Sequence, residues 1–248
     1  MSAIAASAFS AWIAVAALSH AAVRPAAKAR PTPTPPKILN VVRQQLKRGA
    51  VRTYESIEAS IVKAYEHAHV PISWTCLQSK TDASDILYLN TAESLDEWTE
   101  KVARLTQALA AHPELGKLTD RLQTLGGSPP TSTLTTRRED LAYDRTDVDL
   151  RTMKALRLTV FEVTAGHEGQ FVRAMRMGGG RTSPWLLYEA NEGSTFFLVA
   201  PLRSASEAKK GPALPHRLQD LKSVYTVTAS TVYLMRPAMS HLEKLPRR

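Results

Sequence analysis

The segment LNVVRQQLKRGAVRTYESI, residues 39–57, aligns without a gap on LRLTVFEVTAGHEGQFVRA, residues 156–174. The alignment superposes Leu39 on Leu156 and Gly49 on Gly166, and an aromatic residue follows each glycine about one turn into the next segment. Each copy has the pattern of a strand, a glycine turn and an amphipathic helix. Because internal similarity at a fixed offset indicates a repeated structural unit, the chain is predicted to contain one fold twice.

The helix of the first copy is predicted over residues 53–68 and is ended by Pro71. The helix of the second copy is shorter, and Gly178 to Gly180 end it. The apolar stripes are Tyr54, Ile57, Ile61, Ala64 and Tyr65 in the first helix, and Phe171, Ala174 and Met175 in the second.

Both copies continue with two strands that form a predicted hairpin, ISWTCLQ with DILYLN and PWLLYEA with TFFLVAP. A second helix is expected next, because Ser94 with Glu97 and Ser204 with Glu207 have capping-box spacing. In the first copy it covers residues 95–109 and continues over 114–125, whereas the second copy has the weaker LPHRLQDLKSVY. The closing strands TTRREDLAY and YLMRPAMSH also align.

Each copy therefore has the order β-α-β-β-α-β, which is ferredoxin-like. The predicted fold class is α+β, with two tandem ferredoxin-like units packed sheet to sheet as an intrachain α/β barrel, because each sheet must cover its second apolar face. The first unit is predicted over residues 38–145, a linker over 146–155, the second unit over 156–242 and a basic tail over 243–248.

The first 22 residues carry no charged side chain and contain the small-x-small triplet Ser19-His20-Ala21, which predicts a cleaved signal peptide. An uncleaved membrane anchor is the alternative, because about 20 apolar residues suffice to span a bilayer. Residues 23–37 are rich in proline and predict an extended linker. We therefore expect a periplasmic or secreted protein, with contact to a membrane only if the segment is kept.

The formal charge of +9 is concentrated outside the predicted units. Residues 23–37 carry +4 and residues 243–248 carry +2, which leaves roughly +3 for the body. Because nucleic-acid binding needs a clustered basic face, we expect no nucleic-acid partner.

The tandem order resembles the dimeric α/β-barrel superfamily, which includes the antibiotic-biosynthesis monooxygenase type. TAGHEGQF, RREDLAY and RPAMSH are similar to segments of exported bacterial proteins built of two such units. The resemblance implies a cavity for an apolar or aromatic ligand, and it allows a cofactor-independent monooxygenase or a haem-binding or haem-degrading enzyme. Haem-degrading relatives use an Asn, Trp and His constellation, which Asn90 and His67 do not reproduce.

Four aromatic residues are expected near the barrel interior, where they either fill the core or line a ligand cavity. They are Trp74, Tyr88, Trp185 and Phe197.

Arg138 and Arg236 occupy matched positions at the ends of the closing strands, followed by Tyr143 and His241. They either line the entrance of a pocket or form ion pairs with acidic neighbours such as Asp140.

His167 and Glu168 begin like the zinc motif H-E-x-x-H, but Phe171 stands where the second histidine is required. Glu168 in a first helical turn is instead typical of a structural role. Gly178 to Gly180 precede a strand rather than a helix, so they predict a loop and not a phosphate cradle.

His67 and His69 lie at a predicted helix end, where histidine commonly has a structural role, so we expect no metal. Cys76 lies on one strand face with Ile72 and Trp74 and is predicted to be a buried structural thiol.

No complete catalytic set is present in the sequence. The leading prediction is a non-catalytic exported protein that binds a small apolar or aromatic ligand between its two sheets, without a cofactor. The alternatives are an enzyme of the barrel type implied by the resemblance, and a membrane-anchored surface adaptor.

Overall fold

The computed structural model describes residues 35–141, 150, 153–177, 185–207 and 216–242. The predicted signal peptide, most of the proline-rich linker, Tyr143, the loop at Gly178–Gly180 and the basic tail lie outside the described residues. None of the described helices is long and apolar enough to cross a membrane.

Eight strands form one closed antiparallel barrel in the order β1-β3-β2-β8-β5-β7-β6-β4. The strands are β1 (Ile38–Gln45), β2 (Thr75–Ser79), β3 (Asp85–Ala92), β4 (Thr131–Arg137), β5 (Ala155–Val163), β6 (Leu186–Ala190), β7 (Thr195–Leu202) and β8 (Tyr225–Met235). The chain is therefore an α+β barrel, as predicted. The order β4-β1-β3-β2 of the first half recurs as β8-β5-β7-β6 in the second, and the pairs β2–β8 and β4–β6 join the halves.

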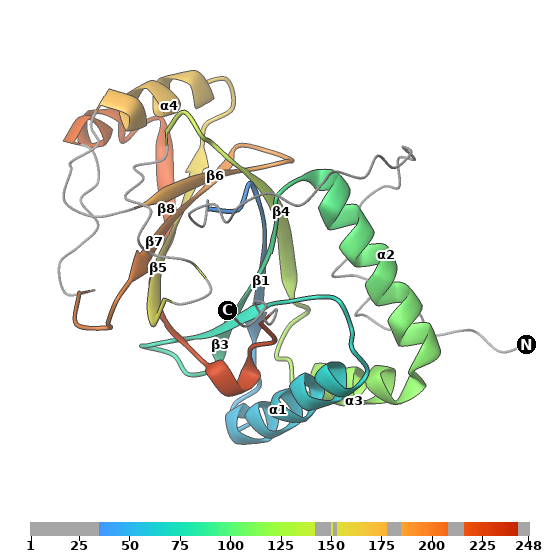
Figure 1. Ribbon diagram of the computed structural model, residues 1–248. Coiled ribbons are helices and arrows are strands. Elements are labelled where there is room, and N and C mark those ends of the chain that lie inside the picture. The colour runs from blue at the N-terminus through green and yellow to red at the C-terminus, as the bar shows by residue number, and fades with distance from the viewer. Residues whose placement is uncertain (1–34, 142–149, 151–152, 178–184, 208–215, 243–248) are drawn as a thin grey trace, which may run out of the picture.

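Helices cover the outside of the barrel (Figure 1). The α-helices of the described chain are α1 (Val51–His67), α2 (Leu95–Ala111), α3 (Pro113–Gln123) and α4 (Glu168–Met177). The first three lie beside the strands of the first half, and α4 lies with the strands of the second half. The described part of LPHRLQDLKSVY forms a 3-10 helix, His216–Leu221, where the sequence predicted an α-helix.

The glycine turns of the two halves have the same geometry. Gly49 has φ 79° and Gly166 has φ 83°, a left-handed conformation in which glycine carries no steric penalty. The predicted capping box is also present, because Ser94 Oγ accepts from the Glu97 N–H at 3.1 Å. The Glu97 carboxylate accepts the N–H of Glu93 at 2.8 Å, which anchors the start of α2.

Apolar side chains are buried on both faces of the sheet. Side chains such as Leu39, Leu87, Leu158 and Val199 point into the barrel and form one core. Their neighbours along the strands point outward and form separate cores beneath α1–α3 and beneath α4. The outward layer of the first half is where the candidate site lies.

Candidate functional site

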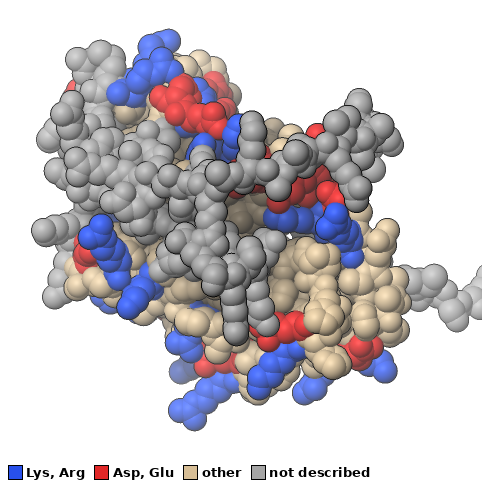
Figure 2. All heavy atoms as spheres, in the orientation of Figure 1, with Lys and Arg blue, Asp and Glu red and all other residues tan. Residues whose placement is uncertain are grey.

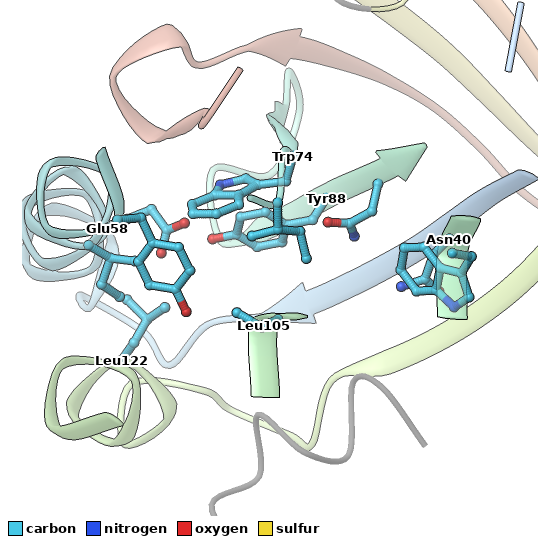
Figure 3. A pocket seen from close by; sticks show the side chains of 11 residues that line it. Asn40, Glu58, Trp74, Tyr88, Leu105 and Leu122 are labelled. Carbon is cyan, nitrogen blue, oxygen red and sulfur yellow. The ribbon is translucent and has the colours of Figure 1, made fainter. Parts of the chain in front are cut away.

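A chamber of about 40 Å³ lies between the outer face of β1 and β3 and the helices α1–α3. Most of its lining is apolar or aromatic, and its polar groups include Asn40, Glu58, Tyr65 and Tyr88. Figure 3 shows Glu58 reaching in from α1 beside Trp74 and Tyr88, with Asn40 farther along β1. A few polar groups in an apolar enclosure are the usual composition of a small-molecule site.

Glu58 belongs to the buried stripe of α1. It follows Tyr54 by four residues and precedes Ile61 and Val62 by three and four, so all four side chains share one helix face. Glu58 is only 3% exposed. An acidic residue is rarely buried this completely unless it is paired or protonated.

The partners of Glu58 are neutral groups. Tyr88 hydrogen-bonds its carboxyl group, and the hydroxyls of Tyr88 and Tyr54 lie 2.6 Å apart. The Trp74 indole N–H donates to the carbonyl oxygen of Met239 at 2.8 Å and also lies close enough to Glu58 to lower its pKa. The result is a chain of hydroxyls that ends on a buried carboxyl group.

Burial dominates the ionisation of Glu58. Desolvation raises its pKa from 4.5 to about 8, and the hydrogen bonds from Tyr88 and Trp74 only partly oppose this. Glu58 is therefore mainly protonated at neutral pH. A strongly perturbed carboxyl in a cavity wall is a recognised sign of a functional site.

Tyr65 is fully buried, and its hydroxyl has no hydrogen-bond partner among the described residues. The nearby Thr119 hydroxyl lowers the pKa of Tyr65 against a larger rise from burial, but it donates its own proton to the Leu115 carbonyl at 3.0 Å. Because buried hydroxyls are nearly always paired, an unpaired one in a cavity wall indicates a missing partner.

A groove of about 400 Å³ adjoins the chamber on the surface side. Tyr65 and Ile72 line both spaces, so these two side chains separate them. The Trp74 ring contacts the Tyr65 ring edge-on, with the ring centroids 5.3 Å apart, and its centroid lies 5.0 Å from that of His241. Ile72 is the half-buried member of the partition and is the simplest point of entry.

The aromatic residues predicted to line the barrel interior divide between two layers. Trp74 and Tyr88 face the α1 layer and Trp185 packs beneath α4, so the prediction of an interior position is wrong for these three. Phe197 does point into the barrel. Trp74 and Tyr88 line the same chamber, whereas the structure does not bring Trp185 or Phe197 to it.

Arg138 and Arg236 form ion pairs, which was the second of the two alternatives. Arg138 donates from Nη1 to Glu189 at 2.8 Å and from Nε to Asp140 at 3.1 Å. Arg236 pairs with Glu55 of α1. Neither arginine lines the chamber, the groove or the barrel cavity.

The space between the sheets is largely filled by side chains, and Leu150 and Met153 belong to this core. A cavity of about 290 Å³ remains at the end of the barrel where β1 ends and β4 begins. Its wall carries threonine hydroxyls and Arg43, which Asp85 holds through two hydrogen bonds of 2.7 and 2.8 Å. The same wall also carries apolar side chains, among them Leu87, Leu158 and Phe197, so a ligand between the sheets would meet polar and apolar groups alike.

The remaining sequence candidates have structural surroundings. His167 is exposed and contacts Gln170, while Glu168 accepts a hydrogen bond from Ser194 at 2.5 Å, which lowers its pKa. The described residues contain no cluster of three or more potential metal ligands. Cys76 is fully buried, and burial raises the pKa of its thiol, so the prediction of a buried thiol is confirmed.

Surface charge is mixed on the described part of the face in Figure 2, where Lys and Arg side chains are interspersed with Asp and Glu. The groove follows this pattern, since Lys101 pairs with Glu97 at 2.7 Å and Arg104 pairs with Glu100.

Comparison with protein-family models and with curated proteins found no match. Among solved structures, a candidate monooxygenase from Fusobacterium nucleatum is similar at 9% identity, with 81% of this chain and 93% of that chain covered and a TM-score of 0.53. An anthrone oxidase-like protein has 12% identity, coverage of 84% and 95% and a TM-score of 0.52. A haem-binding protein from Thermus thermophilus has 11% identity, coverage of 85% and 96% and a TM-score of 0.46.

These similarities concern the fold. The chain shares the barrel fold of the first two of these structures, which is the kind of fold that the sequence resemblance implied. The identities are too low to carry over any residue role.

Haem does not fit the chamber. The chamber is far smaller than the roughly 300–1,000 Å³ of ordinary ligand pockets, and no histidine lines it. His241 lies in the groove, and its Nδ1 contacts the carbonyl oxygen of Ile72.

Sequence reasoning missed Glu58 and Asn40. The available signal was position, because Glu58 interrupts an otherwise apolar helical stripe and Asn40 interrupts an apolar strand.

Proposed function

We propose that the chain binds a small aromatic or apolar molecule with one hydrogen-bonding group, using the chamber and the adjoining groove. The observation that carries the proposal is the pair of polar groups in the chamber wall, the buried Glu58 carboxyl and the unpartnered Tyr65 hydroxyl. Both raise the free energy of the empty protein, and a ligand that hydrogen-bonds them would offset that cost.

The size of the chamber limits how a ligand enters. A cavity of about 150 Å³ is known to accept benzene, whereas this chamber has about 40 Å³. A ring therefore needs displacement of Ile72 and occupies both the chamber and part of the groove, which has about 400 Å³.

Binding of para-fluorinated fragments, followed by fluorine NMR line broadening, tests the proposal. The full-length protein is expected to bind 4-fluorotoluene or 4-fluoroacetophenone, and Ile72→Trp is expected to weaken binding at least tenfold by blocking the partition. Val227→Trp, on an exposed part of β8, is the control and should leave binding unchanged. Absence of broadening with every fragment, or equal binding by Ile72→Trp, would overturn the proposal.

A cofactor-independent monooxygenase acting on a molecule of this kind is the second candidate. It is favoured by the two similar structures with TM-scores above 0.5, one named a candidate monooxygenase and one anthrone oxidase-like. Oxygen uptake on adding anthrone would support the monooxygenase candidate. If no oxygen is taken up, ligand binding remains as the proposed function. Titration with haemin is expected to give no stoichiometric Soret shift.

We further propose that the two halves are tandem ferredoxin-like units. The support is their equal strand order, the matched turns at Gly49 and Gly166, and the matched contact in which Glu207 accepts the Arg203 N–H at 2.9 Å.

We also propose export, based on residues 1–22. N-terminal sequencing of the mature protein tests it, and retention of Met1 or Ser2 would favour the anchored adaptor.

A further inference from the structure

We infer that the bound molecule is a neutral carbonyl compound, such as a small aromatic ketone or aldehyde, whose oxygen accepts hydrogen bonds from Glu58 and Tyr65. This inference rests on the proposed function and specifies the ligand of the same chamber.

Several polar side chains that line the chamber can donate a hydrogen bond, and Asn90, which also lines it, offers both donors and an acceptor. Glu58 carries a proton at neutral pH, and Tyr65 has an unused hydroxyl. At the other end, the side-chain oxygen of Asn40 already accepts from Ser132 Oγ at 2.9 Å, so its NH₂ group is the part left to offer. A carbonyl oxygen brings two lone pairs and no proton, which complements such a set.

The spacing on α1 allows two donors to address one ligand. Tyr65 follows Glu58 by seven residues, or two helical turns, which separates their backbones by about 10 Å along the axis. Both side chains line one small chamber, so they extend toward a common space. A carbonyl oxygen placed in this common space would therefore lie within reach of both donors.

Charged ligands are unfavourable in the same space. The charged side chains near the site lie in the outer groove, where Lys101 and Arg104 are already paired with acidic neighbours. A carboxylate would meet the Glu58 carboxyl group without a cation beside it. An ammonium group would require Glu58 to ionise as well, and both ions would lose their hydration.

The surroundings of Glu58 predict a simple pH dependence. The titratable groups around it are Tyr54 and Tyr65 of α1, Cys76 of β2 and Tyr88 of β3, and burial raises the pKa of each. They stay neutral where Glu58 ionises. Once ionised, Glu58 cannot donate and repels a carbonyl oxygen, so affinity falls as pH passes about 8. Because only the protonated form binds, affinity at pH 9 is about tenfold lower than at pH 7.

Arg236 and Glu55 of α1 are charged side chains outside the chamber. They bind each other, and both influence the thiol of Cys76. Glu55→Gln is therefore a matched control for Glu58→Gln, because it removes a carboxylate three residues earlier on the same helix and outside the chamber.

The experiment compares four fragments that differ only opposite the fluorine: 4-fluoroacetophenone, 4-fluorotoluene, 4-fluorobenzylamine and 4-fluorobenzoate. The ketone is expected to bind at least tenfold more tightly than the amine or the acid at pH 7. Tyr65→Phe should weaken binding of the ketone several-fold and leave binding of 4-fluorotoluene unchanged. Glu58→Gln should remove the pH dependence between pH 7 and 9, and Glu55→Gln should keep it, with circular dichroism confirming that each variant is folded.

Tighter binding of the amine, a flat pH profile in the unmodified protein, or a persistent pH profile in Glu58→Gln would overturn the inference. Each of these results requires that fragments bind, so the proposed function survives it. Failure of every fragment, 4-fluorotoluene included, would instead remove the proposed function together with this inference.

Discussion

The buried carboxyl of Glu58 should make the stability of the protein depend on pH in a definite direction. Its pKa is about 8 in the folded chain against 4.5 for the ordinary group. Between these values the unfolded chain releases a proton that the folded chain keeps, so the unfolded state binds fewer protons and stability falls as pH rises. Below pH 4.5 both states are protonated and the effect vanishes; above pH 8 it is constant.

The magnitude follows from the interval. Each pH unit is worth 1.36 kcal/mol for one proton, so from pH 4.5 to pH 7 the folded state loses about 3 kcal/mol relative to a neutral side chain. No discount for solvent is needed, because Glu58 is 3% exposed. Glu58→Gln has nearly the same shape and cannot ionise. It is therefore expected to gain about 3 kcal/mol over the unmodified protein on going from pH 4 to pH 7.

Urea unfolding at pH 4, 5.5, 7 and 8.5, followed by tryptophan fluorescence, measures this difference. Comparing the variant with the unmodified protein at each pH cancels the contribution of every other titrating group to the free energy of unfolding. Glu55→Gln is the control, and its difference should change by less than about 1 kcal/mol over the same range, as for a half-exposed ion pair. A Glu58→Gln difference that is flat with pH, or that shrinks as pH rises, would show that Glu58 is ionised in the folded protein and refute the reasoning.

Three further predictions concern the backbone and the thiol. His69 follows Ala68, the C-cap of α1, and has φ 52°, so His69→Gly should raise the free energy of unfolding by about 0.5–1 kcal/mol, measured by thermal unfolding. Gly49→Ala and Gly166→Ala should each lower the free energy of unfolding by about 1 kcal/mol, because both glycines have a positive φ. Gly116→Ala, inside α3 with open space around it, should raise the free energy of unfolding by about 1 kcal/mol. Equal effects at all three sites would contradict this. Cys76 should react with a thiol reagent only in urea, and rapid labelling of the native protein would show that the β2 layer opens.

The barrel was predictable because its signals are local and occur twice. Gly49 and Gly166 mark a turn whose left-handed backbone conformation glycine adopts easily, and Ser94 with Glu97 marks the start of a helix. The second helix of the second half failed as a prediction because its pattern in LPHRLQDLKSVY is weak, and its described part forms a 3-10 helix. The local sequence pattern therefore predicted those elements that begin or end at a clear turn or capping motif.

The direction of the strand side chains was not predictable. A strand with one solvated face shows alternation of polar and apolar residues, but β3 is buried at seven of its eight positions because the barrel core covers one face and the helices cover the other. Nothing in DILYLNTA distinguishes Leu87, which points inward, from Tyr88, which points toward α1. For this reason Trp74 and Tyr88 were placed in the wrong layer although their importance was recognised.

The second half shows what the fold requires at the position of Glu58. Continuing the gapless alignment by one residue places Glu58 on Met175, which is fully buried in the core beneath α4. In the same core the Phe171 ring packs against Phe161 and Phe196 at centroid distances of 5.3 and 4.9 Å. A thioether thus satisfies this helix position by packing alone, and the layer closes without a carboxyl group.

The first half departs from that solution at a cost. Replacing an apolar residue by a carboxyl that must stay protonated disfavours folding at neutral pH, and the unpartnered hydroxyl of Tyr65 adds to the cost. Local rules of folding are most often broken where a site needs the group that breaks them. The two halves share a strand order but differ at this helix position, and that difference supports the proposed ligand site in the first half.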